Sequence, residues 1–170
     1  MANKCCIIDV DGTLVDSEKR FKLGQKGNKI DWNFILDPAV VKTFDRPMPR
    51  EIIDRIKQIC KELECEQIII LTGRPERLRE VTIQQLSEVG IKYDRLIMRK
   101  EGDYRKEIDY KLSIIQEISR HCNIVAVFDD NEEVLKCVKV LLPNVRTFKV
   151  SKEGVEEYEY RGLSILSFFQ

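Results

Sequence analysis

The sequence predicts an α/β fold with a mainly parallel sheet and helices on both faces. Short, mainly apolar runs alternate with longer segments whose apolar residues recur every three or four positions. Polar residues follow directly after several of the apolar runs, which is typical of strands that end at the edge of an open α/β sheet. The chain has 170 residues, 43% of them hydrophobic, so it can bury a single core.

Five runs are predicted to be strands, because they are short, mainly apolar and rich in Ile and Val. They cover residues 5–8, 67–71, 94–99, 124–128 and 145–150. Helical periodicity is found between these runs. The predicted helices cover residues from about 50 to 63, 76 to 89, 108 to 120 and 132 to 141. Alternation of this kind predicts parallel strands joined by helices that cover both faces of the sheet.

The segment between the first strand and the first helix breaks the alternation. Residues 19–30 carry five cations and no acid, and their two glycines predict a loop. The cations are Lys19, Arg20, Lys22, Lys26 and Lys29. Residues 31–49 contain three aromatic residues and three prolines. We therefore predict one domain over residues 1–170, with a small irregular insertion at about residues 16–49.

Composition excludes several classes of protein. The formal net charge is zero, so any basic surface must be local. Apolar runs are too short to span a membrane and no signal peptide is visible, so we expect a cytoplasmic protein (host cytoplasm if viral) without a membrane partner. The cysteines lack the Cys-x-x-Cys spacing of metal sites, so we expect a protein of a reducing compartment. Cys5 and Cys6 are expected to be small buried hydrophobic residues. The short spacing between Cys60 and Cys65 is expected to be incidental.

Two carboxylates follow the first strand directly. Asp9 and Asp11 lie two positions apart, so on an ideal strand they point to the same face. Like charges at such a distance repel unless a cation or a shared proton intervenes. The pattern favours a metal-dependent site over an acidic surface turn.

Polar residues also follow two other predicted strands. Thr72 comes after the second strand, and Asp129 and Asp130 come after the fourth. The carboxyl ends of parallel strands lie at one edge of the sheet, where open α/β folds place their sites. Carboxylates and a hydroxyl suit a phosphate group and Mg²⁺, which prefers oxygen ligands.

In sequence order, these segments resemble the four motifs of the haloacid dehalogenase (HAD) superfamily phosphatases. The matching segments are Asp9-Val10-Asp11-Gly12-Thr13, Thr72-Gly73-Arg74, a lysine in a later helix and Asp129-Asp130. Residues 96–105 followed by Lys111 further resemble the 3′-phosphatase domain of phage-type polynucleotide kinases, although Lys106-Glu107 replaces the Pro-Asp of that family. The resemblance implies a HAD-like (Rossmann-type) three-layer sandwich with a small cap insertion.

The resemblance also implies catalytic roles. Asp9 would attack phosphorus to give an aspartyl-phosphate, and Asp11 would protonate the leaving alcohol and later take a proton from water. Neighbouring carboxylates are expected to raise the pKa of Asp11. Thr72 would bind a phosphate oxygen, and Lys111, for which Lys106 is the nearby alternative, would stabilise charge on the transferring group.

Mg²⁺ is the implied cofactor, held by the Asp9 carboxylate, the Asp11 main-chain carbonyl and Asp129, with Asp130 close by. Further residues are expected to contact the phosphorylated substrate. These are Thr13, Gly73, Arg74, Arg105, Lys22, Lys26 and Lys29.

Each assignment has a structural alternative. Thr72 could cap the next helix, and residues 129–131 could do the same. Lys111 could be a solvated lysine on an amphipathic helix. The basic run of residues 19–29 could be a solvated loop. His121, near a predicted helix end, is given no catalytic role.

Three functions fit these features. The first is a polynucleotide 3′-phosphatase of nucleic-acid end processing and repair. The basic run would hold a strand, and Trp32, Phe34 and Tyr104 would offer stacking surfaces, although Trp32 and Phe34 could equally pack the insertion. The second is a phosphatase of mononucleotides or other small phosphomonoesters, for which a larger lid is expected. The third is a non-catalytic binding module, which the intact Asp9 and Asp11 pair disfavours.

The chain contains no Gly-x₄-Gly-Lys-Ser/Thr motif, so we expect no kinase half in it; a kinase could exist on another polypeptide. The sequence does not decide between DNA and RNA. It also leaves open the oligomeric state and the packing of the apolar residues 163–169.

Overall fold

The computed structural model describes residues 2–160 and contains a six-stranded sheet. The strand order is β10-β9-β8-β1-β6-β7, and every neighbouring pair is parallel except β9 and β10. The strands are β1 (Lys4–Ile8), β6 (Gln67–Pro75), β7 (Arg95–Arg99), β8 (Asn123–Asp129), β9 (Arg146–Ser151) and β10 (Gly154–Tyr158). The predicted fold class is confirmed, whereas the apolar residues 163–169 lie outside the described part of the chain.

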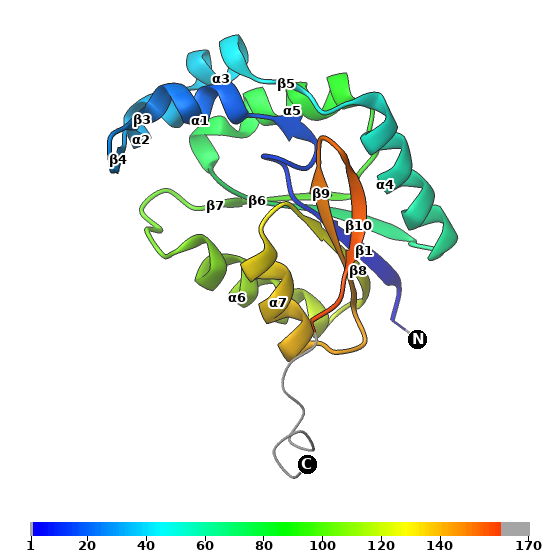
Figure 1. Cartoon of the computed structure of the whole chain (residues 1–170). Coiled ribbons are helices and arrows are strands. Elements are labelled where there is room, and N and C mark those ends of the chain that lie inside the picture. Colours follow the sequence, from blue (N-terminus) through cyan, green and yellow to red (C-terminus); the bar gives the residue numbers. More distant parts are fainter. Residues whose placement is uncertain (1, 161–170) are drawn as a thin grey trace, which may run out of the picture.

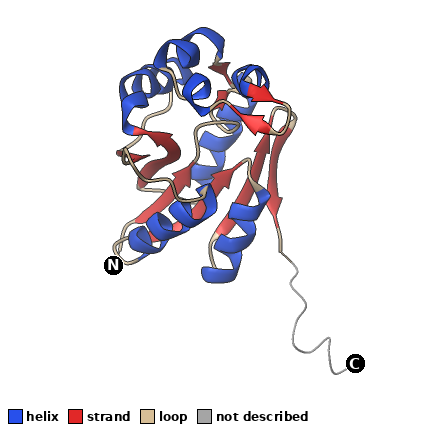
Figure 2. Cartoon of the chain, turned by 90° about the vertical axis from the view of Figure 1, so that its left-hand side faces the viewer, coloured by secondary structure: helices blue, strands red, loops and turns tan. Residues whose placement is uncertain are grey.

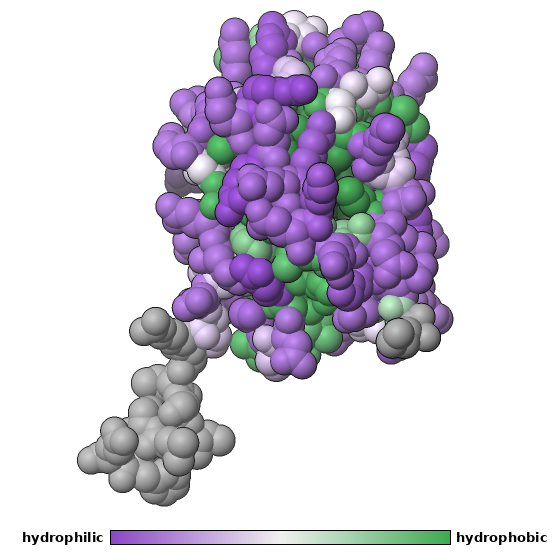
Figure 3. Space-filling model, turned by 90° about the vertical axis from the view of Figure 1, so that its right-hand side faces the viewer, coloured by the Kyte–Doolittle hydropathy of each residue, from purple (hydrophilic) through white to green (hydrophobic). Residues whose placement is uncertain are grey.

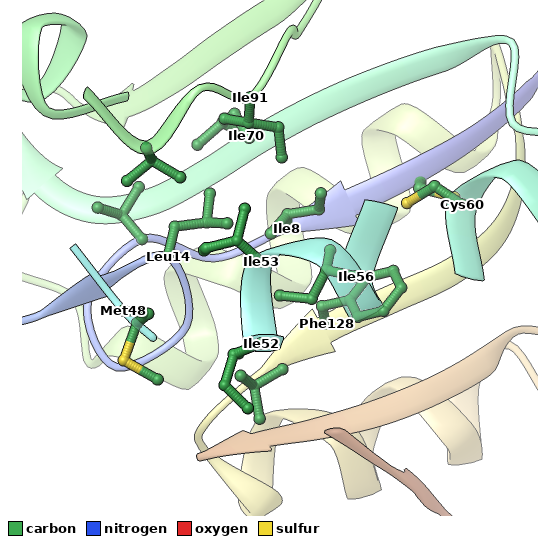
Figure 4. Close-up of a cluster of buried hydrophobic side chains, with 14 of the residues drawn as sticks. Ile8, Leu14, Met48, Ile52, Ile53, Ile56, Cys60, Ile70, Ile91 and Phe128 are labelled. Atoms are coloured by element: carbon green, nitrogen blue, oxygen red, sulfur yellow. The ribbon is translucent and has the colours of Figure 1, made fainter. Parts of the chain in front are cut away.

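Four helices cover the sheet, two on each face (Figure 1). They are α4 (Arg50–Glu62) and α5 (Arg79–Val89) on one face, and α6 (Glu107–Ser119) and α7 (Glu132–Leu141) on the other. The alternation of β1 explains the two cores: Cys6 and Ile8 pack toward α4 and α5, while Cys5 and Ile7 pack toward α6 and α7. Figure 4 shows Ile8 in the first core, close to Ile53 on α4.

The insertion is closed by two short strands, β2 (Val15–Asp16) and β5 (Arg46–Pro47), which pair antiparallel. It lies at the top of Figures 1 and 2, and its helix α3 contacts α5. Between β2 and β5 the chain forms three helices and a hairpin. They are α1 (Glu18–Gly24), β3 (Gln25–Lys26), β4 (Lys29–Ile30), α2 (Trp32–Ile35) and α3 (Pro38–Phe44).

The prediction of a loop over residues 19–30 is wrong in its first half, which is α1. Gly24 lies in this helix, at a point where close packing leaves no room for a side chain. A Cβ at Gly24 would lie 2.4 Å from Cγ1 of Ile35. The glycine therefore marks a close contact between α1 and α2, which sequence composition alone does not distinguish from a loop signal.

Two further features were not predicted. The acidic segment after β9 forms β10, whose Glu157 pairs with Arg146 across the hairpin (Nη2 to Oε1, 2.7 Å). Cys6 is joined to Cys65 by a disulfide, so the expectation that Cys6 is only a small buried hydrophobic residue is wrong. The two cysteines are 59 positions apart, and nothing in their local sequence indicates the pairing.

None of the described helices is long and apolar enough to cross a membrane. Figure 3 views the right-hand side of Figure 1 and shows mainly hydrophilic side chains around a discontinuous band of hydrophobic ones. That surface is ordinary, because folded proteins leave much apolar area in contact with water.

Candidate active site

A tight turn after β1 places both leading carboxylates. The strand ends at Ile8, and the carbonyl oxygen of Val10 then accepts hydrogen bonds from the N–H groups of residues 13, 14 and 15, at 2.9–3.1 Å. Gly12 has a φ of +80°, and a Cβ there would lie 2.2 Å from Oδ2 of Asp130. Glycine is therefore required both by the backbone conformation and by the approach of Asp130.

Asp9 is held on both of its oxygens. Lys111 Nζ, on α6, donates to Asp9 Oδ1 at 2.9 Å, and the Thr13 hydroxyl donates to Oδ2 at 3.3 Å. The same Nζ donates to Asp129 Oδ2 at 2.8 Å and lies 3.0 Å from Oε1 of Glu107. Lys111 is only 1% exposed, so the alternative of a solvated lysine is excluded. Thr13 is therefore placed to orient the Asp9 carboxylate.

The carboxylates near Lys111 are crowded: Asp9 and Asp129 are buried, and Asp130 lies beside them at the surface. Oxygens of Asp9, Asp129 and Asp130 lie within 4.8 Å of one another. Burial and the charge of Asp129 hold the pKa of Asp9 well above its usual range, although Lys111 acts in the opposite sense. Burial and Asp129 also raise the pKa of Asp130 to about 7. A hard divalent cation among these oxygens would favour their ionised forms, so the three residues fit Mg²⁺.

Asp11 faces a different set of partners. Arg20 and Arg74 each donate from Nη2 to Asp11 Oδ1 at 2.7 Å, and Arg74 Nε donates to Oδ2 at 3.0 Å. Both arginines also bind Asp45, through Arg20 Nε at 2.8 Å and Arg74 Nη2 at 3.0 Å. We call Asp11, Arg20, Asp45 and Arg74 the arginine–aspartate cluster. Only Asp11 reaches solvent, with 23% of its side chain exposed.

The cluster reverses the predicted pKa of Asp11. Burial acts to raise this pKa, but the charges and hydrogen bonds of Arg74, with the charge of Arg20, lower it to about 2. The prediction of a raised pKa is wrong because the chain leaves the strand at Ile8. Asp9 and Asp11 therefore do not share one environment, and Asp11 meets arginines instead of carboxylates.

The residues at the end of β6 lie beside Asp11 and complete the site on that side. Thr72 lies inside the strand, and its hydroxyl accepts a hydrogen bond from the Arg74 N–H at 3.1 Å, so it does not cap a helix. The Gly73 carbonyl accepts from Arg99 Nε at 3.0 Å. All three guanidinium nitrogens of Arg74 are engaged, Nη1 by Thr82 and Gln85. The expectation that Arg74 contacts substrate is corrected: it is 2% exposed and holds Asp11.

The remaining predicted contacts lie at the surface, with one exception. Arg105 is 48% exposed and binds Asp103, with Nη2 2.7 Å from Oδ2. Lys22 pairs with Glu18 and Lys26 pairs with Asp31, at 2.7 and 3.3 Å, and both lysines are exposed, as is Lys29. Arg20 is the exception: it is completely buried in the arginine–aspartate cluster and is unavailable to a nucleic-acid strand.

The three aromatic residues expected to offer stacking surfaces separate into two kinds. Trp32 is 54% exposed, and Tyr104, in the loop after β7, is 94% exposed. Phe34 packs against Phe44, with ring centroids 6.2 Å apart, and so stabilises the insertion.

Of residues 129–131, only Asn131 caps a helix. Its side chain accepts a hydrogen bond from the Glu133 N–H at 3.0 Å at the start of α7, while Asp129 faces Lys111.

Sequence reasoning missed three residues of the site. Glu107 had a usable signal, because it stands four positions before Lys111 on the same helix. Arg20 was assigned to the surface run, and Asp45 was assigned no role. Both reach the site only because the insertion folds back onto Asp11 and Arg74, and no spacing in the sequence encodes that contact.

Comparison with known proteins agrees with this geometry. Residues 3–153 match the model of the polynucleotide kinase PNKP phosphatase domain, a family of the HAD superfamily. The chain belongs to this family. It is accordingly a HAD-type phosphatase, of a superfamily that generally uses Mg²⁺. No protein of curated function matches the chain significantly.

Solved structures are similar in fold. In the Pnkp1/Rnl/Hen1 complex, one chain is 25% identical with a TM-score of 0.65, over 88% of this chain and 46% of that one. A chain of the Pnkp1/Rnl/Hen1 RNA repair complex is 24% identical with a TM-score of 0.58, over 88% and 43%. A candidate beta-phosphoglucomutase from Thermotoga maritima is 14% identical with a TM-score of 0.54, over 96% and 90%. The chain thus spans less than half the length of the two Pnkp1-complex chains.

The arginine–aspartate cluster predicts a large loss of stability when one of its charges is removed. Asp45→Asn keeps the shape but leaves two buried arginines sharing one carboxylate, and breaking such buried pairs costs about 3–5 kcal/mol. Urea unfolding measures this change in free energy. Asp54→Asn, which affects only an exposed pair with Arg50, should change it by less than about 1 kcal/mol. A loss below about 1 kcal/mol for Asp45→Asn would contradict the assignment.

Proposed function

We propose that this domain hydrolyses phosphomonoesters through an aspartyl-phosphate on Asp9, and that its natural substrate is a nucleic-acid end carrying a 3′-phosphate. The observation that carries the proposal is the buried contact of Lys111 Nζ with Asp9 Oδ1 and Asp129 Oδ2, at 2.9 and 2.8 Å. A lysine at this place neutralises charge on the nucleophile and on a phosphoryl group transferred to it.

In the first step, Asp9 attacks phosphorus, and the bond between phosphorus and the leaving alcohol oxygen breaks as the new bond forms. Lys111 and Thr13 fix the carboxylate, so that it is oriented before substrate arrives. The leaving oxygen takes a proton from Asp11. In the second step, water attacks the aspartyl-phosphate, Asp11 accepts a proton from that water, and the Asp9 carboxylate is released with inorganic phosphate.

The free enzyme holds Asp11 in the ionised form, because Arg74 and Arg20 lower its pKa to about 2 despite burial. That form suits the second step, in which Asp11 acts as a base. A bound phosphate dianion adds negative charge beside Asp11 and so raises its pKa, which favours the protonated form that the first step needs. The arginines therefore position one carboxyl group for both roles.

Asp9, Asp129 and the main-chain carbonyl of Asp11 would hold Mg²⁺, with Asp130 beside them. The ion supplies positive charge that offsets repulsion between the Asp9 carboxylate and the phosphate dianion. Lys111 supplies further positive charge at the same place. Burial acts to lower its pKa, but Asp129 and Asp9 raise that pKa well above the usual lysine value, so the ammonium group stays charged.

The nucleic-acid substrate is supported by the family match and by the RNA repair complex among the similar structures. It is also supported by the surface around the site. The hairpin β3–β4 and the β7–α6 loop both lie at the left of Figure 1, where β6 and β7 end. The hairpin carries Lys26 and Lys29, and the loop carries Tyr104 and Arg105. Cations and an exposed aromatic ring suit a single strand.

The nucleophile is tested with Asp9→Asn, which keeps the shape but removes the attacking anion. Hydrolysis of a 3′-phosphorylated oligonucleotide should fall below about a tenth of the wild-type rate, because each tenfold is only ~1.4 kcal/mol of barrier and a lost nucleophile costs more. The exposed Asp54→Asn is the matched control and should keep full activity. Comparing its hydrolysis with that of 5′-phosphorylated oligonucleotides and of mononucleotides determines the substrate preference. A preference for mononucleotides would favour the small-molecule alternative.

The metal is tested by chelation and by Asp129→Ala. Activity should vanish in chelator and return with Mg²⁺, and Asp129→Ala should raise the Mg²⁺ concentration needed or abolish turnover. Glu133→Ala, at an exposed position four residues along the chain, should leave the Mg²⁺ titration unchanged. Full activity in chelator, with no metal found by elemental analysis, would refute the proposal.

The basic run is tested through salt dependence. Lys22→Gln, Lys26→Gln and Lys29→Gln combined should raise the KM for a 3′-phosphorylated oligonucleotide and flatten its dependence on salt. Each backbone contact to a single strand contributes about 0.7 to the slope of log affinity against log salt, so three contacts contribute about 2. Hydrolysis of a small aryl phosphate should be unchanged, because other residues perform the chemical step.

The matched control for this test neutralises three exposed lysines outside the basic run of residues 19–29. It combines Lys42→Gln, Lys61→Gln and Lys92→Gln. The control should keep the wild-type salt slope on the oligonucleotide. If the two triple variants and the wild type show the same slope, Lys22, Lys26 and Lys29 do not contact the strand.

A further inference from the structure

An open cleft of about 420 Å³ lies at the base of the insertion, outside the catalytic residues. Its walls come from three places in the fold: the start of α1, the junction of α3 with β5, and the turn between β9 and β10. Lys19, Phe44 and Arg46 line it on the insertion side, and Lys152 lines it on the sheet side. The volume is in the usual range for sites that bind small molecules.

The cleft has more positive charge than negative. Its two acids, Asp16 and Glu18, are both engaged by Lys152, and Glu18 also pairs with Lys22 at 2.7 Å. Within residues 2–160, Lys19 and Arg46 form no ion pair with a carboxylate. Arg46 Nη1 donates only to main-chain carbonyls, at 2.7 and 3.0 Å. Two uncompensated cations therefore remain to attract an anion.

The cleft also presents an aromatic ring. Phe44 is half-buried and packs against Phe34, and Lys19 Nζ lies over its ring, 5.4 Å from the centroid. An aromatic ring beside uncompensated cations is the combination that receives a flat base together with a phosphate. A purely anionic ligand would make no use of Phe44, and a purely apolar ligand would leave Lys19 and Arg46 unpaired.

Helix α1 separates this cleft from the active site. Successive residues of a helix are about 100° apart, so Glu18 and Lys22, each two positions from Arg20, point away from it. Arg20 is buried against Asp11 and Asp45, whereas Glu18 and Lys22 line the cleft. A helix is about 10 Å across, so a molecule in the cleft does not occupy the place of the transferred phosphate.

We propose that this cleft binds a nucleotide unit, with its phosphate at Lys19 and Arg46 and its base against Phe44. The unit is either a free nucleotide or part of a nucleic-acid strand, since both present the same chemistry. The proposal goes beyond the phosphatase function, because the cleft lies on the other side of α1 from Asp9 and Asp11. Its occupation would contact the helix that carries Arg20 and the strand β5 that follows Asp45.

The test is calorimetric titration of the full chain with ADP, with unphosphorylated octathymidylate and with pyrophosphate. Binding of ADP alone supports a free nucleotide, binding of octathymidylate alone supports a strand, and binding of both supports either source. The dissociation constant of the ligand that binds should be below about 1 mM. Absence of binding by both ADP and octathymidylate overturns the proposal.

Variants locate the binding. Arg46→Gln should weaken the binding of the nucleotide ligand and of pyrophosphate at least fivefold, because it removes a phosphate contact. Phe44→Leu should weaken the nucleotide ligand at least fivefold and pyrophosphate less than twofold. Lys42→Gln, an exposed cation two residues before Phe44 on α3, is the matched control and should stay within twofold. Unchanged affinity in both Arg46→Gln and Phe44→Leu overturns the proposal.

A loss of affinity in Arg46→Gln but not in Phe44→Leu would also overturn it, in favour of a plain anion site. Melting temperatures close to that of the wild type exclude misfolding as the cause. Arg46→Gln should hydrolyse a small aryl phosphate at the wild-type rate, since Arg46 has no place in the catalytic machinery. Because binding is measured without turnover, a failure of the proposed 3′-phosphatase activity would leave this result standing.

Discussion

The candidate active site depends on two buried arginines that share two buried or half-buried carboxylates. Arg20 comes from the insertion and Arg74 from the end of β6, and Asp11 and Asp45 lie between them. Each charge is tolerable inside the protein only because the others are present, since an isolated ion would cost several kcal/mol to bury. The cluster therefore joins the insertion to the sheet and fixes the position of Asp11 at the same time.

The same arrangement divides the site electrostatically. Asp9 stands on the side of Lys111, Asp129 and Asp130, where negative charge is in excess and a divalent cation fits. Asp11, two residues later, stands on the side of the arginines, where its carboxylate is fully compensated. Two neighbouring carboxyl groups thus acquire opposite pKa shifts, upward for Asp9 and downward for Asp11, because one faces carboxylates and the other faces arginines.

Sequence reasoning worked where local periodicity and strand order decide the outcome. It predicted the parallel sheet, and it predicted that Asp9 and Asp129 meet, because the carboxyl ends of parallel strands share one edge. It failed where a contact joins distant segments without a repeating pattern. The partnership of Asp45 with Arg20 and Arg74, the disulfide of Cys6 with Cys65 and the pKa of Asp11 are all of this kind.

The cluster also bears on how substrate reaches Asp9. Because the insertion supplies Arg20 and Asp45, lifting it as a hinged lid would pull buried charges apart at a cost of several kcal/mol. Lys152 adds a second tie, from the β9–β10 turn to Asp16 and Glu18 at the base of the insertion. An insertion held by the buried cluster is part of the wall of the candidate active site, not a cover that opens and closes.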